Sequence, residues 1–226
     1  MDDLTILYIS ASQMPDSWVK FQVEKLLQAC EDAPIISVTR KPTKLGKNLI
    51  DKETKCYWNI YRQMLRAAKF AKTKYVAMAE DDTLYSKEHF TEYRPPDNAC
   101  SYNWARWILF QWKPDMYSIK QRVSNCTLIA PTDYLVDALQ ERENKYPHGN
   151  HWCGEVGRNK TEKRLRVSRR NSTKWYSTVP VVQLNHKTGT DTGGGVGRTK
   201  RHGQIKAYDI PYWGKPEGIV KHYGTV

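Results

Sequence analysis

The first 80 residues alternate between continuous apolar runs and segments with helical spacing. "LTILYIS", residues 4–10, is an apolar run that ends in small polar side chains, as expected for a strand buried on both faces. "PIISVTR", residues 34–40, and "KYVAMA", residues 74–79, predict two further strands. Residues 16–30 and 56–72 space apolar side chains three and four positions apart, which predicts two amphipathic helices. This order is typical of an α/β fold with a mostly parallel, Rossmann-like sheet flanked by helices.

The second half of the chain has a weaker pattern. "SNCTLIAP", residues 124–131, predicts a strand, the residues from Thr132 a helix, and "TVPVVQLNH", residues 178–186, a late strand. Residues 187–203 are rich in Gly and Thr and fit neither a helix nor a regular strand. We therefore expect one compact domain built from two halves, residues 1–98 and residues 99–226. In the first helix, the expected buried stripe is Val19, Val23, Leu26, Leu27 and Cys30.

Polar residues follow each of the first three predicted strands. Ligands of parallel sheets bind beyond the carboxyl ends of the strands, so residues 10–12, 39–41 and 80–82 should open onto one crevice. The last of these segments is Glu80, Asp81 and Asp82. Three neighbouring carboxylates repel one another unless a positive group lies between them, and Mg²⁺ or Mn²⁺ prefers such oxygen ligands. A solvated loop or a helix cap is the alternative, but the position after a buried strand favours a metal site.

Positive charge is concentrated in one part of the chain. The formal net charge is +12, and residues 158–206 contain thirteen Lys or Arg against two acidic residues. This block creates a local positive field suited to a polyanion, although a solvated loop region would have the same composition.

Hydropathy and cysteine content favour a cytoplasmic protein. The mean hydropathy is −0.73, and no apolar run approaches the 18 residues of a membrane span. "MDDLTILYISAS" lacks the basic region and long apolar core of a secretory signal. Five cysteines without a C-x-x-C pair predict free thiols in a reducing compartment.

Taken in order, these parts resemble the nucleotide-sugar-dependent glycosyltransferases of the GT-A fold. The resemblance rests on a nucleotide-binding first strand, an acidic cluster after a buried strand, a later strand and helix, and His186 after a late strand. The family pattern is usually D-x-D, whereas here Glu80 and Asp82 take the outer positions. The resemblance implies a UDP-sugar donor and a Mn²⁺ or Mg²⁺ ion held by Asp82, Glu80 and His186. It also implies a nucleotide-sugar-binding half, residues 1–98, and an acceptor-binding half, residues 99–226.

Donor recognition is expected at the first two strand ends and in the Gly-rich segment. Hydroxyl and amide side chains there can bond the base or ribose, and basic side chains can reach phosphate. The glycines after His186 can fold over phosphates through their backbone N–H groups and form a lid. Capping, surface charge and a flexible surface loop are the alternative roles. The candidate donor-binding residues are Ser10, Ser12, Gln13, Arg40, Asp81, Lys187 and Arg198.

An inverting transfer also needs a base that removes the proton of the acceptor hydroxyl. Glu155 in "HWCGEVGRN" is the candidate, with Asp81 as a second catalytic candidate in the acidic cluster. Asp133 and Asp137 are alternatives, and a salt bridge to Arg158 is an alternative role for Glu155. A retaining enzyme requires no such base.

The basic block exceeds the needs of one diphosphate, so a nucleic acid is a candidate partner. Aromatic rings nearby can stack on an extruded base. Small basic glycosyltransferases of this kind look like bacteriophage enzymes that modify 5-hydroxymethylpyrimidines in DNA, which implies hexosyl or pentosyl transfer to DNA in the host cytoplasm. A glycan or protein acceptor, and a metal-dependent nucleic-acid-binding or nucleotidyl-transfer protein, are the alternatives. The candidate nucleic-acid-binding residues are Arg158, Lys163, Arg164, Arg166, Arg169, Arg170, Trp152 and Trp107.

Overall fold

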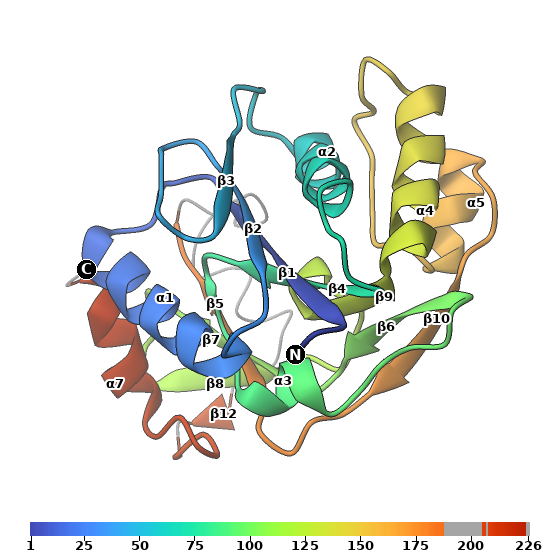
Figure 1. The fold of residues 1–226 in the computed structure, drawn as a ribbon. Helices are drawn as coiled ribbons and strands as arrows, with labels where there is room; N and C mark the ends of the chain where they lie inside the picture. The colour runs from blue at the N-terminus through green and yellow to red at the C-terminus, as the bar shows by residue number, and fades with distance from the viewer. Residues whose placement is uncertain (188–204, 207, 225–226) are drawn as a thin grey trace.

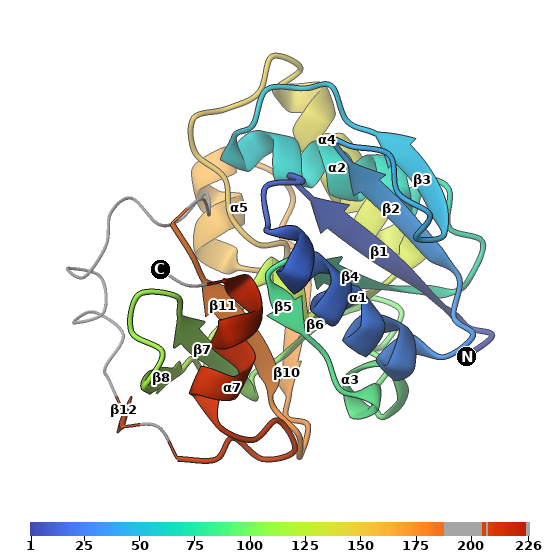
Figure 2. The same ribbon diagram turned by 90° about the vertical axis from the view of Figure 1, so that its left-hand side faces the viewer.

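A computed structural model describes residues 1–187, 205–206 and 208–224, and in it the chain forms two β-sheets with helices packed around them (Figures 1 and 2). The main sheet has seven strands in the order β10-β6-β9-β4-β1-β2-β3. Its strands, in chain order, are β1 (Leu4–Ser10), β2 (Ile35–Thr39), β3 (Lys47–Ile50), β4 (Tyr75–Glu80), β6 (Ala99–Asn103), β9 (Leu128–Pro131) and β10 (Asn171–Trp175).

The core of this sheet is the parallel arrangement that the apolar runs predict. β1 pairs in parallel with both β2 and β4, and β3 adds in parallel beyond β2. β9 lies antiparallel between β4 and β6, which makes the sheet mixed but mostly parallel. The predicted α/β fold class is confirmed. β3 was not predicted, because its side chains are only partly buried and its sequence "KNLI" lacks an apolar run.

Helices cover both faces of the main sheet (Figure 2). α2 (Tyr57–Ala68) and α4 (Thr132–Lys145) pack on one face, and α1 (Asp16–Cys30) and α3 (Lys87–Thr91) on the other. The predicted stripe of α1 is partly wrong, since Leu27 is 46% exposed while Trp18 and Gln22 are buried. The helix is rotated so that Trp18 and Gln22 can bond the loop after β4, as described below.

A second sheet was not predicted from the sequence. It has the order β12-β8-β7-β11-β5, and only β7 and β11 pair in parallel among its described strands. A separate core joins it to α1, to the last helix and to the short 3₁₀ helix η3. Its elements and the remaining helices are β5 (Thr83–Leu84), β7 (Arg106–Phe110), β8 (Met116–Ile119), η1 (Asn125–Thr127), α5 (Asn159–Leu165), β11 (Val181–Asn185), β12 (Ile205–Lys206), α7 (Pro216–Val220) and η3 (Lys221–Tyr223).

Both halves of the chain contribute adjacent strands to the one main sheet, which they share at the pairing of β4 with β9. β1 to β4 come from residues 1–98, and β6, β9 and β10 from residues 99–226. The predicted division of labour between the halves therefore stays a prediction about the site and does not describe separate folding units. None of the helices in the described part of the chain combines the length and hydropathy needed to cross a membrane.

Candidate active site

The acidic cluster lies where the sequence predicts it, at the carboxyl edge of the main sheet. Glu80 is the last residue of β4, and Asp81 and Asp82 form the turn that leads into β5. α1 fixes this turn, because the indole of Trp18 donates to the carbonyl of Asp81 (2.7 Å) and the amide of Gln22 donates to that of Thr83 (3.0 Å). These two hydrogen bonds fix the backbone of the turn and so restrain the positions of its carboxylates.

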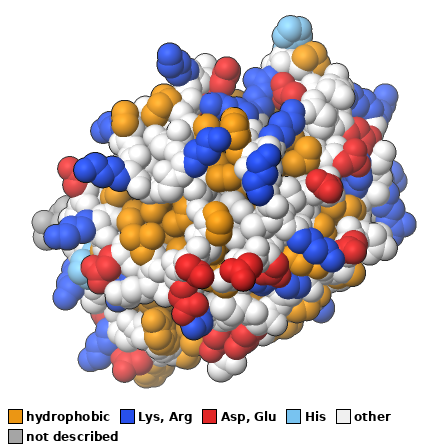
Figure 3. All heavy atoms as spheres, in the orientation of Figure 1, with side chains coloured by type: hydrophobic (Ala, Val, Ile, Leu, Met, Phe, Trp, Pro, Cys, Tyr) orange, Lys and Arg blue, Asp and Glu red, His pale blue; other side chains and the backbone are white. Residues whose placement is uncertain are grey.

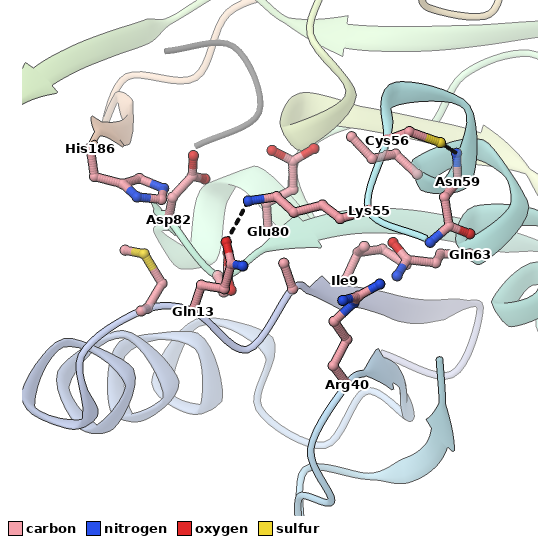
Figure 4. Close-up of a pocket in the computed structure, with 14 residues that line it drawn as sticks. Ile9, Gln13, Arg40, Lys55, Cys56, Asn59, Gln63, Glu80, Asp82 and His186 are labelled. Atoms are coloured by element: carbon pink, nitrogen blue, oxygen red, sulfur yellow. Dashed lines mark hydrogen bonds between the residues drawn. The ribbon is translucent and has the colours of Figure 1, made fainter. Parts of the chain in front are cut away.

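All three acids line a cavity that Figure 4 shows in close-up. This first cavity has a volume of about 110 Å³ and adjoins a second of about 550 Å³. Glu80, Asp82 and His186 line both, so the two cavities meet at the carboxylates. The first cavity alone is smaller than the usual site of a ligand of nucleotide size. A ligand of that size must therefore extend past the carboxylates into the second cavity.

Hydrogen bonds orient two of the carboxylates. Asp81 accepts from the hydroxyl of Ser10 (2.5 Å). Asp82 accepts from the hydroxyl of Thr83 (2.6 Å) and from the amide of Gln183 on β11 (3.1 Å). The second sheet thus contributes to the geometry of the acidic turn.

Burial and mutual repulsion act against ionisation of the cluster. Burial raises the pKa of Glu80 to about 8, helped by the charges of Asp82 and Asp81. Burial and the charge of Asp82 raise the pKa of Asp81 to about 7, and the hydrogen bond from Ser10 opposes this shift. The fully ionised cluster is therefore short of positive charge.

A pH-dependent stability follows from these shifts. Between about pH 5 and pH 8 the folded protein holds protons that Glu80 and Asp81 lose on unfolding, so their contribution to the free energy of unfolding falls as pH rises. We expect Mn²⁺ to raise the melting temperature more at pH 8 than at pH 5.5, because ionised carboxylates bind the ion. Differential scanning fluorimetry in EDTA and in Mn²⁺ measures both effects. Glu80→Gln should flatten the pH dependence, and a Mn²⁺ effect equal at both pH values would contradict the assignment.

Lys55 places a positive charge in the first cavity. It lines the wall between the acids and α2, and its ammonium donates to the side-chain oxygen of Gln13 (Figure 4). Its charge lowers the pKa of Asp81, after the larger contributions described above, and it also acts on His186. No motif in the loop before α2 distinguishes Lys55 from other surface lysines, so it is not predictable from the sequence.

A buried carboxylate anchors the loop that carries Lys55. The side chain of Asp51 is fully buried and accepts from the amides of Asn59 and Gln63, each at 2.8 Å. Arg66 completes the arrangement with an ion pair of 2.9 Å. The three partners lie on one stripe of α2, so the helix holds the start of the loop against the sheet.

Removing this anchor should destabilise the protein. Asp51→Ala leaves three buried or half-buried donors without their acceptor, and we expect a loss of about 3 kcal/mol in the free energy of unfolding. Urea denaturation followed by tryptophan fluorescence measures it. Asp115→Ala removes an exposed acid and is the control, expected to change stability by less than about 0.5 kcal/mol. Equal stabilities of the two variants would show that Asp51 is not an anchor.

His186 lies directly after β11 and lines both cavities, as expected for a residue near the acids. It is 7% exposed, and burial lowers the pKa of its imidazole while the charge of Asp82 opposes this shift. The ring is therefore neutral near pH 7 and suited to metal coordination. Lys187 is exposed and lines neither cavity, and its backbone N–H donates to Gln111 (3.0 Å). Arg198 and the glycines of the expected lid lie outside the described residues.

The acids fit an ion that completes its shell from a ligand. Within the residues that the structure describes, no three His, Cys, Asp or Glu side chains converge into a ready-made metal site. Mg²⁺ is commonly held by one or two carboxylates, with phosphate oxygens and water filling the other positions. Partly buried carboxylates with too little positive charge nearby suit this kind of site. Joint ligation by Asp82, Glu80 and His186 stays a prediction.

Two of the predicted donor-binding residues support the site from behind. Ser10 bonds Asp81, and the hydroxyl of Ser12 accepts from the backbone N–H groups of Arg40 (3.1 Å) and Lys41 (3.2 Å). Neither serine is on the lining of the first cavity, whereas Gln13 and Arg40 are. The serine hydroxyls are occupied, because Ser10 joins the end of β1 to the turn after β4 and Ser12 joins it to the end of β2.

Glu155 lines the second cavity, and its charge adds a small contribution to the raised pKa of Glu80. It also forms the ion pair with Arg158, at 3.2 Å, that was the alternative role. The loop that carries it is held by Arg142 of α4, which is 2% exposed and donates to the carbonyl of Gly154 (2.8 Å). Asp133 and Asp137 lie on the exposed side of α4, and neither is on the cavity lining, so they do not serve this site.

The basic segment is divided among several roles. Arg158 and Trp152 line the second cavity, and the guanidinium of Arg164 lies 4.4 Å from the ring of Trp152. Arg170 is bound in ion pairs with Asp137 (2.7 Å) and Glu141 (3.0 Å). Its charge is therefore compensated, which argues against its predicted role at a polyanion.

The other predicted nucleic-acid contacts lie away from the cavity. Lys163, Arg166 and Arg169 are exposed but not on its lining. Trp107 points to the opposite face of β7, where it packs against the core of the second sheet and stacks on Tyr117 with ring centres 4.7 Å apart. Successive side chains of a strand point to opposite faces, so Trp107 faces away from the cavity that Arg106 lines. On the face shown in Figure 3, Lys and Arg are interspersed with Asp and Glu and form no continuous basic stripe.

Three residues of the second cavity were missed by sequence reasoning. Arg106 and Gln183 are polar positions within otherwise apolar strands, which is a signal that they face a site. Arg122 lies in a loop and carries no such signal.

Comparison with known proteins supports the fold. No family model and no curated protein matches the chain. The glycosyltransferase GlyE of Streptococcus pneumoniae TIGR4 aligns with 100% of this chain and 61% of its own, at 8% identity and a TM-score of 0.52. The likeness at this identity establishes a GT-A-like fold and nothing about activity.

Two other solved structures align less closely. The mannosyltransferase PcManGT of Pyrobaculum calidifontis, solved with GDP-Man and Mn²⁺, aligns over 83% of this chain and 58% of its own, at 11% identity and a TM-score of 0.46. A nucleotidyl transferase from Methanothermobacter thermautotroptrophicus aligns over 62% and 76%, at 13% identity and a TM-score of 0.41. The chain spans about three fifths of the length of the two glycosyltransferases.

Proposed function

We propose that the protein is a metal-dependent glycosyltransferase that transfers a sugar from a UDP-sugar to the hydroxymethyl group of a modified pyrimidine in DNA. The observation that carries the proposal is the meeting of two cavities at Glu80, Asp82 and His186. In this proposal the donor nucleotide begins in the first cavity and extends past the carboxylates, and the rest of the second cavity takes the acceptor. The GT-A-like fold supports the same reading of the carboxyl edge.

The donor half of the proposal rests on the charges in the first cavity. Arg40 and Lys55 line it together with the three acids. A nucleoside diphosphate that enters there meets more negative than positive side chains, so its binding requires a divalent ion. When bound, that ion neutralises the charge that grows on the leaving diphosphate. In this proposal Lys55 and Arg40 bind phosphate or base, and Asp82 with Glu80 and His186 holds the ion.

The acceptor half rests on the second cavity. Glu155 is on its lining and can take the proton of an acceptor hydroxyl in an inverting reaction. Cationic side chains and the ring of Trp152 are also on the lining, which supports an acceptor with phosphates and a planar base. In this proposal residues 1–98 bind mainly the donor and residues 99–226 mainly the acceptor.

Mass spectrometry of DNA tests the proposal. Plain and 5-hydroxymethylated DNA are incubated with a panel of UDP-sugars and Mn²⁺, and we expect a sugar adduct on hydroxymethylated DNA alone. UDP-sugar hydrolysis without any DNA adduct would redirect the acceptor to a glycan or protein. The absence of both hydrolysis and transfer for every nucleotide sugar would contradict a glycosyltransferase, and polynucleotide products from nucleotides would identify a nucleotidyl transferase.

A further inference from the structure

A buried arginine that has no carboxylate partner among the described residues lies on the wall of the second cavity. Arg106 is 3% exposed, and no ion pair involves it among the described residues. Its Nη1 donates to the side-chain oxygen of Gln183 (2.7 Å) and contacts the thiol of Cys126 (3.9 Å). Its Nε has no hydrogen-bond partner in the described part of the chain. A buried guanidinium usually requires an anion, and these neutral partners do not supply one.

Two further cations surround Arg106. The backbone N–H of Lys120 donates to the carbonyl of Arg106 (2.7 Å), which brings the loop of residues 120–122 next to β7. Arg122 lies on the cavity lining and is exposed. Burial, together with the charges of Arg122 and Arg106, lowers the pKa of Lys120 to about 8. Both arginines therefore repel Lys120, and a bound anion would offset this repulsion.

The acids of the donor site do not neutralise this group by contact. Glu80 interacts with Arg106 through space, and Gln183 separates Arg106 from Asp82. The amide of Gln183 accepts from Arg106 and donates to Asp82, so it fixes both side chains. An anion on Arg106 would thus be held one side chain away from the acidic cluster.

We propose that Arg106 and Arg122 form a phosphate-binding subsite in the second cavity that takes a phosphate group of the acceptor. The assignment of this phosphate to the acceptor rests on the proposed function, whereas the phosphate site itself does not. Arginine suits this role, because its planar donors match phosphate oxygens in pairs. A phosphate bound there would place the rest of the acceptor near Glu155 and the acidic cluster, since Arg106, Arg122 and these acids line the same cavity.

Phosphate binding by the 226-residue chain tests the subsite without any enzymatic assay. Isothermal titration with inorganic phosphate, in the absence of metal and nucleotide, should show saturable binding. Arg122→Gln should weaken it about tenfold, as expected for loss of a charge-assisted hydrogen-bonding group. Lys20→Gln removes an exposed cation of α1 that lines neither cavity and is the matched control. Equal affinities of wild type and Arg122→Gln, or no saturable binding, would overturn the proposal.

A second measurement distinguishes an acceptor phosphate from a donor phosphate. We expect saturating UDP with Mn²⁺ to leave phosphate affinity within about twofold, because Arg106 and Arg122 line only the second cavity, whereas the ion and the diphosphate are expected at the acids where the two cavities meet. Arg122-dependent competition by UDP would assign the subsite to the donor and overturn the acceptor role.

The acceptor role has its own comparison in hydroxymethylated oligonucleotides. Replacement of one backbone phosphate beside the modified base by a neutral methylphosphonate should reduce binding by wild type and leave binding by Arg122→Gln unchanged. Equal reduction in both proteins would overturn the acceptor role. Failure of sugar transfer with intact phosphate binding would refute the proposed function and leave the phosphate site in place.

Discussion

Replacing Asp82 with asparagine is expected to reduce Mn²⁺-dependent turnover of a UDP-sugar by about 10³-fold. The substitution keeps the shape of the side chain, whose oxygen can accept from the amide of Gln183 while its NH₂ donates to the hydroxyl of Thr83, but it removes the charge that would hold the ion. A metal ion that stabilises a leaving diphosphate contributes several kcal/mol to the transition state, and about 4 kcal/mol corresponds to 10³-fold in rate. Release of UDP with the best donor measures the effect.

Binding measurements separate loss of metal from loss of fold. We expect Asp82→Asn to bind Mn²⁺ at least about tenfold more weakly by titration calorimetry. Its melting temperature in EDTA should equal or exceed that of wild type, because one source of repulsion in the cluster is removed. Asp115→Asn, at an exposed turn outside both cavities, is the control and should match wild type in turnover. Full activity of Asp82→Asn at limiting Mn²⁺ would remove the metal assignment.

Glu155→Gln is expected to reduce sugar transfer by about 10²- to 10⁴-fold while leaving donor affinity within about twofold, the range associated with loss of a general base. The carboxylate lines the second cavity only, so its removal does not alter the lining of the first. Transfer assays with the identified acceptor, and UDP binding with Mn²⁺, measure the two effects separately.

The ion pair of Glu155 with Arg158 supplies the control. If the carboxylate matters only through that pair, Arg158→Gln should reduce transfer as much as Glu155→Gln does, since either change breaks the contact of 3.2 Å. If Glu155 is the base, Arg158→Gln should retain most of the catalytic rate and chiefly weaken acceptor binding. Wild-type turnover by Glu155→Gln would exclude an inverting mechanism that uses this residue.

Much of the main sheet could be predicted from local sequence. β1, β2 and β4 are continuous apolar runs, because central parallel strands are buried on both faces. Their carboxyl ends must share one edge of the sheet, which places Glu80 to Asp82 near Arg40 without any knowledge of side-chain packing. The acidic cluster, the crevice and the fold class followed from this rule alone.

The second sheet and the details of the cavities depended on contacts distant in the chain. The sequence suggests that Trp107 is available for stacking on a base. The pairing of β7 with β11 and β8 instead directs Trp107 to the core of the second sheet and Arg106 to the cavity. Lys55 enters the first cavity because buried Asp51 bonds a polar stripe of α2. Neither the orientation of Trp107 nor the position of Lys55 follows from the spacing of residues in the sequence.

Local sequence was enough to predict the parallel strand core and the acids at its edge, since burial on both faces is a local property of each apolar run. Which charges meet those acids depends on packing between distant parts of the chain. That packing placed His186 and Lys55 beside them, bound Arg170 to α4, and buried Arg106 with no acidic partner in the described part of the chain. Charges act through space, and the distances between them are set by packing of segments far apart in sequence.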